Sequence, residues 1–141
     1  MRGLGDFRLG GGDLRPAIPF LVMYGCAFLF SGVSVRRVVF LLYAFLYPGF
    51  TEEFLDRGGL QQFLLRISKS ASAAVTIAAL LFAAAYIPDF AFRAYRGALP
   101  LAIGNVADAA VYGVFLGYGV HMFGMLWPWM VIHALSDVVG W

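Results

Sequence analysis

The stretch TEEFLDRG, residues 51–58, places three carboxylates and one guanidinium close together in a chain that is otherwise mostly apolar. A charge at the centre of a membrane helix costs about 2.5–3.5 kcal/mol on insertion scales. A cluster this dense therefore needs partners inside the protein or a chemical use. Its composition leaves two hypotheses open, a structural ion-pair node and a proton-handling site.

The composition of the whole chain predicts an integral membrane protein. Of its 141 residues, 62% are hydrophobic and 13% are charged, whereas soluble domains carry about 25% charged residues. The net charge of +2 gives no basis for nucleic-acid binding. The single cysteine, Cys26, lies in an apolar run and is interpreted as a small hydrophobic residue. The lipid bilayer is therefore an expected partner of the protein.

Apolar runs divide the chain into helices, because a helix needs about 20 apolar residues to cross a membrane. The Gly58–Gly59 pair predicts a helix break after the charged cluster, and the apolar spacing that follows predicts an amphipathic helix lying in the interface. Trp127 and Trp129 are expected to be interface anchors. The predicted hydrophobic helices cover residues 16–35, 38–57, 70–88, 99–122 and 128–140, and the amphipathic helix covers residues 60–69.

The fold class predicted from these segments is all-α, a polytopic transmembrane helical bundle of about five hydrophobic helices plus one interfacial amphipathic helix. Residues 1–15 are expected to form a Gly-rich N-terminal arm. Residues 16–141 are expected to form a single transmembrane domain. The last helix, at 1.5 Å per residue, is too short to cross a hydrocarbon core of about 30 Å.

Helical spacing separates the roles of the two adjacent glutamates. Residues four apart share a helix face, so Glu53 is expected to pair with Arg57. Glu52 is rotated by about 100° and shares a face with Asp56. Two carboxylates so placed repel, which favours retention of a proton by one of them. Glu53 is therefore predicted to be structural, and Glu52 is the candidate general base.

A second pair, His133 and Asp137, also lies four residues apart in an apolar segment. A carboxylate beside an imidazole can fix its tautomer and raise its basicity; the alternative is a buried pair with a structural role only. The other histidine, His121, is expected to be structural. The sequence contains no His-Glu-x-x-His motif and no cysteine pair, so neither a metal ligand nor a cofactor is predicted.

Together these motifs resemble the type II CAAX prenyl endopeptidase family, also called the Abi or CPBP family of intramembrane proteases. The family's first motif, Glu-Glu-x-x-x-Arg, stands here at residues 52–57, and its last motif, His-x-x-x-Asn or His-x-x-x-Asp, at residues 133–137. The resemblance covers roughly residues 38–137. The family's middle motif, Phe-x-x-x-His, matches residues 82–86, where Tyr86 takes the place of the histidine.

The resemblance implies roles for six residues. Glu52 would activate water for attack on a peptide bond, and Glu53 and Arg57 would support it. The family's histidines and final Asn or Asp are taken to stabilise an oxyanion or hold a metal, which assigns His133 and Asp137. Tyr86 can donate one hydrogen bond to an oxyanion but carries no positive charge.

Because of Tyr86, the sequence favours a non-catalytic relative that acts as an accessory or scaffold subunit of a larger membrane complex. The alternative is an intramembrane endopeptidase that cleaves lipidated or membrane-embedded peptides, with Glu52 as general base. The chain is thus either an active enzyme or a pseudoenzyme. Other membrane-protein subunits are the expected partners, with a peptide substrate under the alternative, and the expected location is the bacterial inner membrane.

Overall fold

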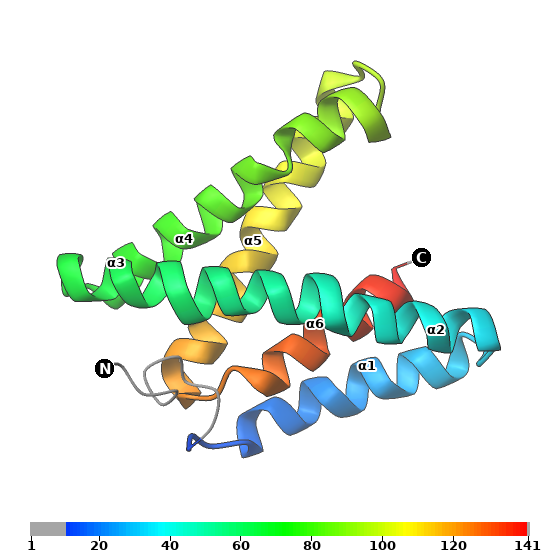
Figure 1. The fold of residues 1–141 in the computed structure, drawn as a ribbon, viewed down its shortest axis with the longest axis horizontal. Coiled ribbons are helices and arrows are strands. Elements are labelled where there is room, and N and C mark those ends of the chain that lie inside the picture. The colour runs from blue at the N-terminus through cyan, green and yellow to red at the C-terminus, as the bar shows by residue number, and fades with distance from the viewer. Residues whose placement is uncertain (1–10, 141) are drawn as a thin grey trace. The chain divides into compact units, whose positions relative to one another are not determined.

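A computed structural model describes residues 11–140, and residues 1–10 and 141 lie outside the described part. The described residues form helices and turns without a β-strand, which confirms the predicted all-α class (Figure 1). The α-helices are α1 (Ile18–Phe30), α2 (Val35–Ala44), α3 (Gln61–Ser68), α4 (Ala71–Ala85), α5 (Leu99–Phe123) and α6 (Trp127–Val139). Wider π-helical turns form η3 (Phe45–Glu52), η4 (Phe54–Leu60) and η5 (Asp89–Ala94), and a 3₁₀ turn, η2 (Arg15–Ala17), precedes α1.

Three helical stretches are long and apolar enough to cross a membrane, namely Val35–Ser68, Ala71–Ala94 and Leu99–Phe123. The protein is therefore an integral membrane protein with a transmembrane helical fold. The predicted first span, residues 16–35, is wrong in its extent, since the apolar helix there covers only Arg15–Phe30. The helix stops because Gly32 adopts a left-handed φ of +90°, and the Ser34 hydroxyl then caps α2 by accepting from the Arg37 N–H.

The predicted break at Gly58–Gly59 is wrong, because the helix that starts with α2 continues through η3, η4 and α3 (Figure 1). Glycine inside a helix costs about 1 kcal/mol relative to alanine but does not by itself stop the helix. The helix ends only at Lys69, whose φ of +54° is left-handed, and Ser70 then caps α4. The segment after residue 88, which the predicted helices leave out, is likewise partly helical, since η5 continues α4 to Ala94.

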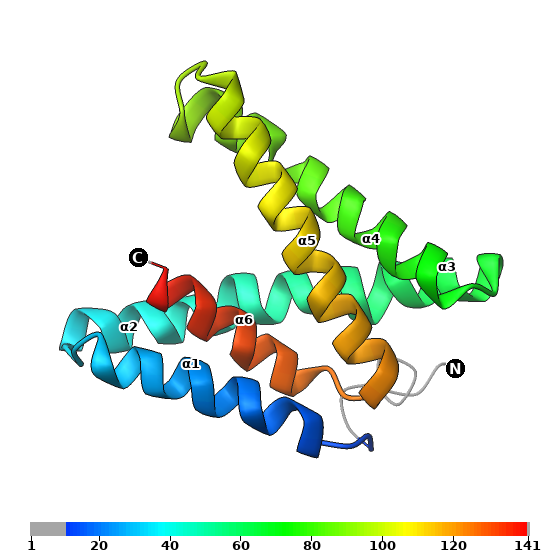
Figure 2. The ribbon, with the colours of Figure 1, turned by 180° about the vertical axis from the view of Figure 1, so that it is seen from behind.

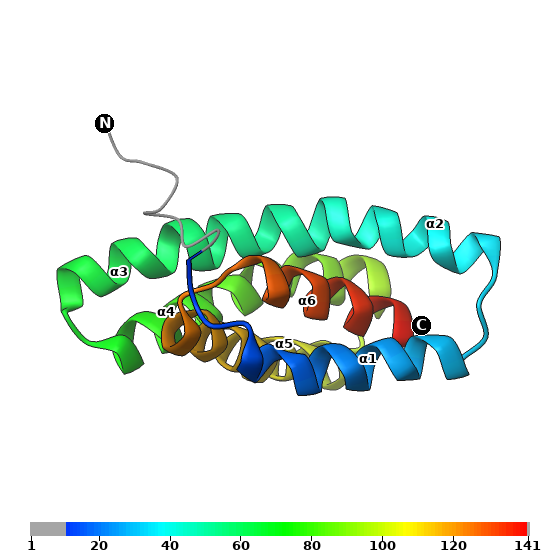
Figure 3. The same cartoon turned by 90° about the horizontal axis from the view of Figure 1, so that it is seen from below.

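The chain divides into two compact units, residues 1–59 with 119–141 and residues 60–118. In the first unit α6 lies between α1 and the helix that starts with α2, as Figures 2 and 3 show. One cluster of its core is formed by small and aliphatic side chains around one phenylalanine: Phe28, Ala44, Ala134, Leu135 and Val138. In the second unit α3 packs on α4, and the buried Gln61 amide donates to the Gly117 carbonyl of α5 at 2.9 Å. The single-domain organisation of residues 16–141 stays a prediction.

Of the predicted N-terminal arm, residues 1–10 lie outside the described residues, while Gly12 and Asp13 run against the end of α5. The Asp13 N–H donates to the Phe123 carbonyl at 2.9 Å. A side chain at position 12 would collide with that same carbonyl. The hydrogen bond from the Arg15 guanidinium holds the pKa of Asp13 below its usual value. This part of the arm is therefore fixed to the first unit.

Trp129 belongs to the core of the first unit, which makes its predicted role as an interface anchor wrong. Its side chain is 1% exposed, and its ring lies 6.0 Å from Phe20 and 6.2 Å from Phe123 between centroids. The third neighbour is Gly119 of α5, where a Cβ would lie 2.5 Å from the indole ring. The missing side chain at position 119 makes room for the tryptophan.

We expect Gly119→Ala to lower the free energy of unfolding by about 1–3 kcal/mol, because the added methyl group overpacks the Trp129 site. Gly104→Ala in the same helix is the matched control, since a Cβ there meets nothing within 4 Å. The control should be neutral or up to about 1 kcal/mol stabilising. Unfolding in detergent, followed by tryptophan fluorescence, measures both variants. Equal stability of the two variants would contradict the packing described for Trp129.

Candidate functional site

The charged cluster lies where the membrane helix Val35–Ser68 widens into π-helical turns. η3 ends at Glu52, and η4 begins at Phe54. Such wide turns are rare and occur frequently at functional sites. Close packing accompanies them, because a Cβ at Gly49 would lie 2.7 Å from the Met130 carbonyl oxygen of α6. This glycine lets the helix that bears the glutamates approach the segment of α6 that bears His133.

Glu53 is the centre of the cluster and is fully buried. Its Oε2 lies 3.3 Å from the Arg57 Nε, and both side chains are at most 1% exposed, so the predicted pairing four residues apart is present. Its Oε1 lies 2.9 Å from the His133 Nδ1. One buried carboxylate thus forms an ion pair with a guanidinium and a hydrogen bond with an imidazole at the same time.

The contact with Glu53 determines the tautomer and the orientation of the His133 ring. A carboxylate accepts hydrogen bonds only, so Nδ1 carries the proton and donates it to Glu53. The Nε2 on the opposite side of the ring lies 3.9 Å from Glu52 Oε2 and 3.9 Å from Asp137 Oδ1. His133 and Asp137 therefore do share a helix face. Glu53 fixes the ring, and Nε2 faces the two remaining carboxylates.

The cluster has a buried inner layer and a partly exposed outer layer. Glu53, Arg57 and His133 are at most 5% exposed, whereas the side chains of Glu52 and Asp137 are 24% and 32% exposed. Buried charges persist only when they are paired, which the inner layer satisfies. The outer carboxylates keep part of their surface exposed, although the Glu52 Oε2 that faces His133 is itself buried.

Asp56 has a different neighbour from Glu52. Its Oδ2 lies 3.7 Å from the Arg57 Nη1, while Glu52 faces His133. The prediction that Glu52 and Asp56 share a face assumed an α-helical turn of 100° per residue, but η3 and η4 are π-helical and turn less per residue. Repulsion between these two carboxylates stays a prediction.

Tyr86, which stands at the position of the family's middle histidine, is described within the second unit. It ends α4, where its ring contacts Phe82 edge-on at 5.2 Å and stacks on Phe90 at 5.6 Å. The aromatic contacts account for a large side chain at this position. A role for Tyr86 in chemistry stays a prediction.

The arrangement of donor groups decides whether the chain can bind a metal ion. Across residues 11–140, no group of three or more His, Cys, Asp and Glu side chains is arranged to hold a metal ion. His133 uses Nδ1 for Glu53 and offers a single nitrogen, whereas zinc sites use three or four protein ligands at about 2 Å. The side chains of residues 11–140 therefore do not fit a metal site.

The contact between Glu53 and His133 is the part of the site that the sequence motifs did not reveal. Each motif predicts contacts within its own helix only, where positions four apart share a face. The two residues are 80 positions apart, and no local spacing indicates their contact. Two features of the sequence are consistent with this contact. One is Gly49, where the helix lies close to the backbone of α6, and the other is the presence of the two polar motifs.

The family comparison covers both motifs. The family model described as Type II CAAX prenyl endopeptidase Rce1-like matches residues 34–139, which include Glu52–Arg57 and His133–Asp137. No curated protein and no solved structure gave a significant match. The match extends over most of the chain and agrees with the resemblance that the motifs indicated. The chain therefore belongs to the type II CAAX prenyl endopeptidase Rce1-like family.

Proposed function

We propose that the protein is an intramembrane endopeptidase that cleaves lipidated or membrane-embedded peptides, with Glu52 as its general base. One observation carries the proposal: the partly exposed Glu52 carboxylate faces the His133 Nε2 at 3.9 Å, while the buried Glu53 holds the other ring nitrogen at 2.9 Å. A base beside a fixed imidazole is an arrangement that acid–base hydrolysis uses. Family membership supports the same activity.

In the proposed reaction Glu52 takes a proton from water as the water oxygen bonds to the peptide carbonyl carbon. The carbonyl π electrons move to oxygen and form an oxyanion. His133 in its imidazolium form donates from Nδ1 to Glu53 and from Nε2 to the oxyanion. When the C–N bond breaks, the carbonyl reforms and the leaving nitrogen takes the proton from Glu52. The products are a carboxylic acid and an amine.

Arg57 and Asp137 support these steps in the proposal. Arg57 pairs with Glu53, the acceptor for His133, because its guanidinium lies 3.3 Å from that carboxylate inside the protein. Asp137, 3.9 Å from Nε2, favours the charged imidazolium when the oxyanion forms. Neither residue needs to exchange a proton with the substrate.

A second candidate is a non-catalytic accessory or scaffold subunit of a larger membrane complex, and Tyr86 favours it. A phenol cannot supply the positive charge of a histidine to an oxyanion, and removing one oxyanion donor typically costs about 10²–10³ in rate. Under this proposal the polar cluster holds the helices together, and other membrane-protein subunits are the partners. For both candidates we propose the bacterial inner membrane as the location.

The test is cleavage of a panel of lipidated peptides by the protein in proteoliposomes, with products identified by mass spectrometry. We expect the wild-type protein to cleave and His133→Ala to lose about 10²–10³ in rate. His121→Ala, which removes the only other histidine, should keep the wild-type rate. If wild-type protein that is folded and incorporated into the liposomes did not cleave any peptide, the protease proposal would be overturned. The scaffold proposal would then remain. A His133→Ala rate equal to that of wild type would overturn the assigned site.

A further inference from the structure

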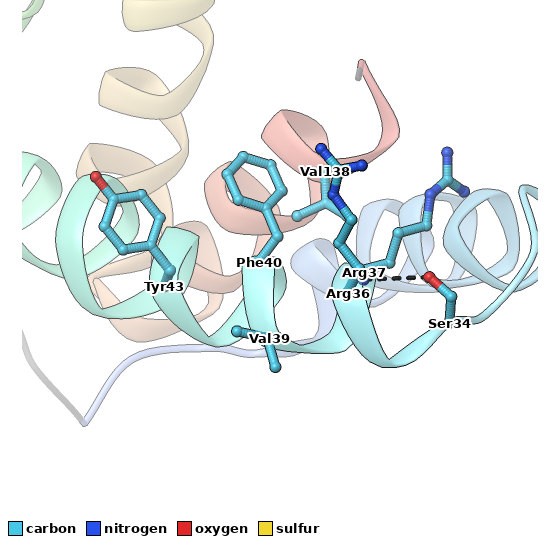
Figure 4. A pocket seen from close by; sticks show the side chains of 7 residues that line it. All are labelled: Ser34, Arg36, Arg37, Val39, Phe40, Tyr43 and Val138. Carbon is cyan, nitrogen blue, oxygen red and sulfur yellow. Dashed lines mark hydrogen bonds between the residues drawn. The ribbon is translucent and has the colours of Figure 1, made fainter.

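A pocket of about 780 Å³ opens at the start of the membrane helix Val35–Ser68, and no residue of the charged cluster lines it. Its wall combines two arginines with a serine hydroxyl and mainly apolar side chains, namely Ser34, Arg36, Arg37, Val39, Phe40, Tyr43 and Val138 (Figure 4). Pockets that bind small molecules typically measure about 300–1,000 Å³. None of the six residues assigned to the proteolytic site lines it.

Two of the residues that line this pocket, Arg36 and Arg37, are positively charged. Arg37 donates to the carbonyl oxygens of Ser31 at 2.6 Å and Gly32 at 3.3 Å, which are neutral acceptors. Within residues 11–140, no carboxylate forms an ion pair with Arg36 or Arg37. An anion is therefore the complementary ligand, and phosphate oxygens match the donor geometry of arginine especially well.

The rest of the pocket is apolar and continues along the helix. The rings of Phe40 and Tyr43 stack at 6.1 Å between centroids, and Figure 4 shows both on the side of α2 from which the arginines extend. Val138 of α6 completes the wall. The arginines belong to the first turn of a membrane span that begins at Val35. The charged end of the pocket matches the headgroup of a lipid, and the apolar surface along the span matches its acyl chain.

We propose that this pocket binds an anionic glycerophospholipid, with its phosphate on Arg36 and Arg37 and an acyl chain against Phe40 and Tyr43. The charge of the pocket selects an anionic over a zwitterionic headgroup. Its place at the end of a membrane span selects a lipid over a soluble phosphate. The proposal is independent of peptidase activity, since the pocket and the charged cluster share no lining residue.

The test compares binding of fluorescent phosphatidylglycerol and phosphatidylcholine with identical chains to the detergent-solubilised full chain, measured by fluorescence anisotropy. We expect phosphatidylglycerol to bind more tightly. Arg36→Gln should weaken it about fivefold, because an arginine near an anionic lipid contributes roughly that factor, and should leave phosphatidylcholine unchanged. Arg36→Lys, which keeps the charge, should restore most of the affinity.

Arg66→Gln is the matched control, since it removes an exposed arginine that does not line the pocket. It should leave the affinity for phosphatidylglycerol unchanged. Equal binding of the two lipids by wild type, or an equal loss in Arg36→Gln and Arg66→Gln, would overturn the proposal. Complete displacement of phosphatidylglycerol by inorganic phosphate would also overturn it, because the pocket would then bind a free anion. Wild-type unfolding temperatures in both glutamine variants confirm that folded protein is compared.

Discussion

Glu53→Ala is expected to lower the free energy of unfolding by about 3–5 kcal/mol, the cost of breaking a buried ion pair by removing one partner. The carboxylate is fully buried and contacts both the Arg57 guanidinium at 3.3 Å and the His133 ring at 2.9 Å. Without it, a guanidinium that is 1% exposed loses its closest counter-charge. Denaturant unfolding in detergent micelles, followed by tryptophan fluorescence, measures the loss.

Asp137→Ala is the matched control for that loss. Asp137 also faces His133, but at 3.9 Å and with 32% of its side chain exposed. Exposed ion pairs contribute roughly 0–1 kcal/mol, so this variant should remain close to wild type. Equal destabilisation by Glu53→Ala and Asp137→Ala would contradict the distinction between an inner and an outer layer.

Glu52→Gln is expected to remove cleavage while leaving the fold intact. Glutamine has nearly the shape of glutamate but cannot take a proton from water, and general acid–base catalysis contributes about 10²–10⁴ in rate. Glu52 is 24% exposed, and His133 keeps its contact with Glu53 when Glu52 is neutralised, so no buried charge loses its only partner. The measurement is kcat/KM for one lipidated peptide in proteoliposomes, with the unfolding temperature recorded on the same sample.

Asp56→Asn serves as the control for Glu52→Gln, because it neutralises the other partly exposed carboxylate of this helix. Asp56 lies beside Arg57 rather than His133, at 3.7 Å from Nη1. It should retain most of the wild-type kcat/KM. If Asp56→Asn instead abolished cleavage and Glu52→Gln did not, the general base would be Asp56.

Local spacing accounts for the parts of the site that could be predicted from the sequence. Glu53 and Arg57, and likewise His133 and Asp137, lie four residues apart, and each pair meets in the structure. Such contacts depend only on helical geometry, so a single helix determines them. The contact of Glu53 with His133 depends on how two helices pack and could not be obtained in this way.

The helix boundaries show a similar limit. Gly58 and Gly59 predicted a break because glycine disfavours helix in water-exposed segments, yet the helix runs on to Ser68. A long membrane segment keeps its backbone hydrogen bonds because lipid offers no alternative partners. Trp129 was assigned to the interface by its residue type, whereas the space at Gly119 places it in the core. Both errors arise where the tertiary or membrane environment overrides a local preference.

We propose that the two adjacent glutamates have separate roles, with Glu53 holding the fold and Glu52 acting in the chemistry. Comparing the thermal unfolding midpoints of Glu52→Gln and Glu53→Gln in one detergent tests this claim without reference to any substrate. We predict a midpoint near wild type for Glu52→Gln and a decrease of about 6 °C or more for Glu53→Gln. Equal decreases, or a larger decrease for Glu52→Gln, would contradict the claim.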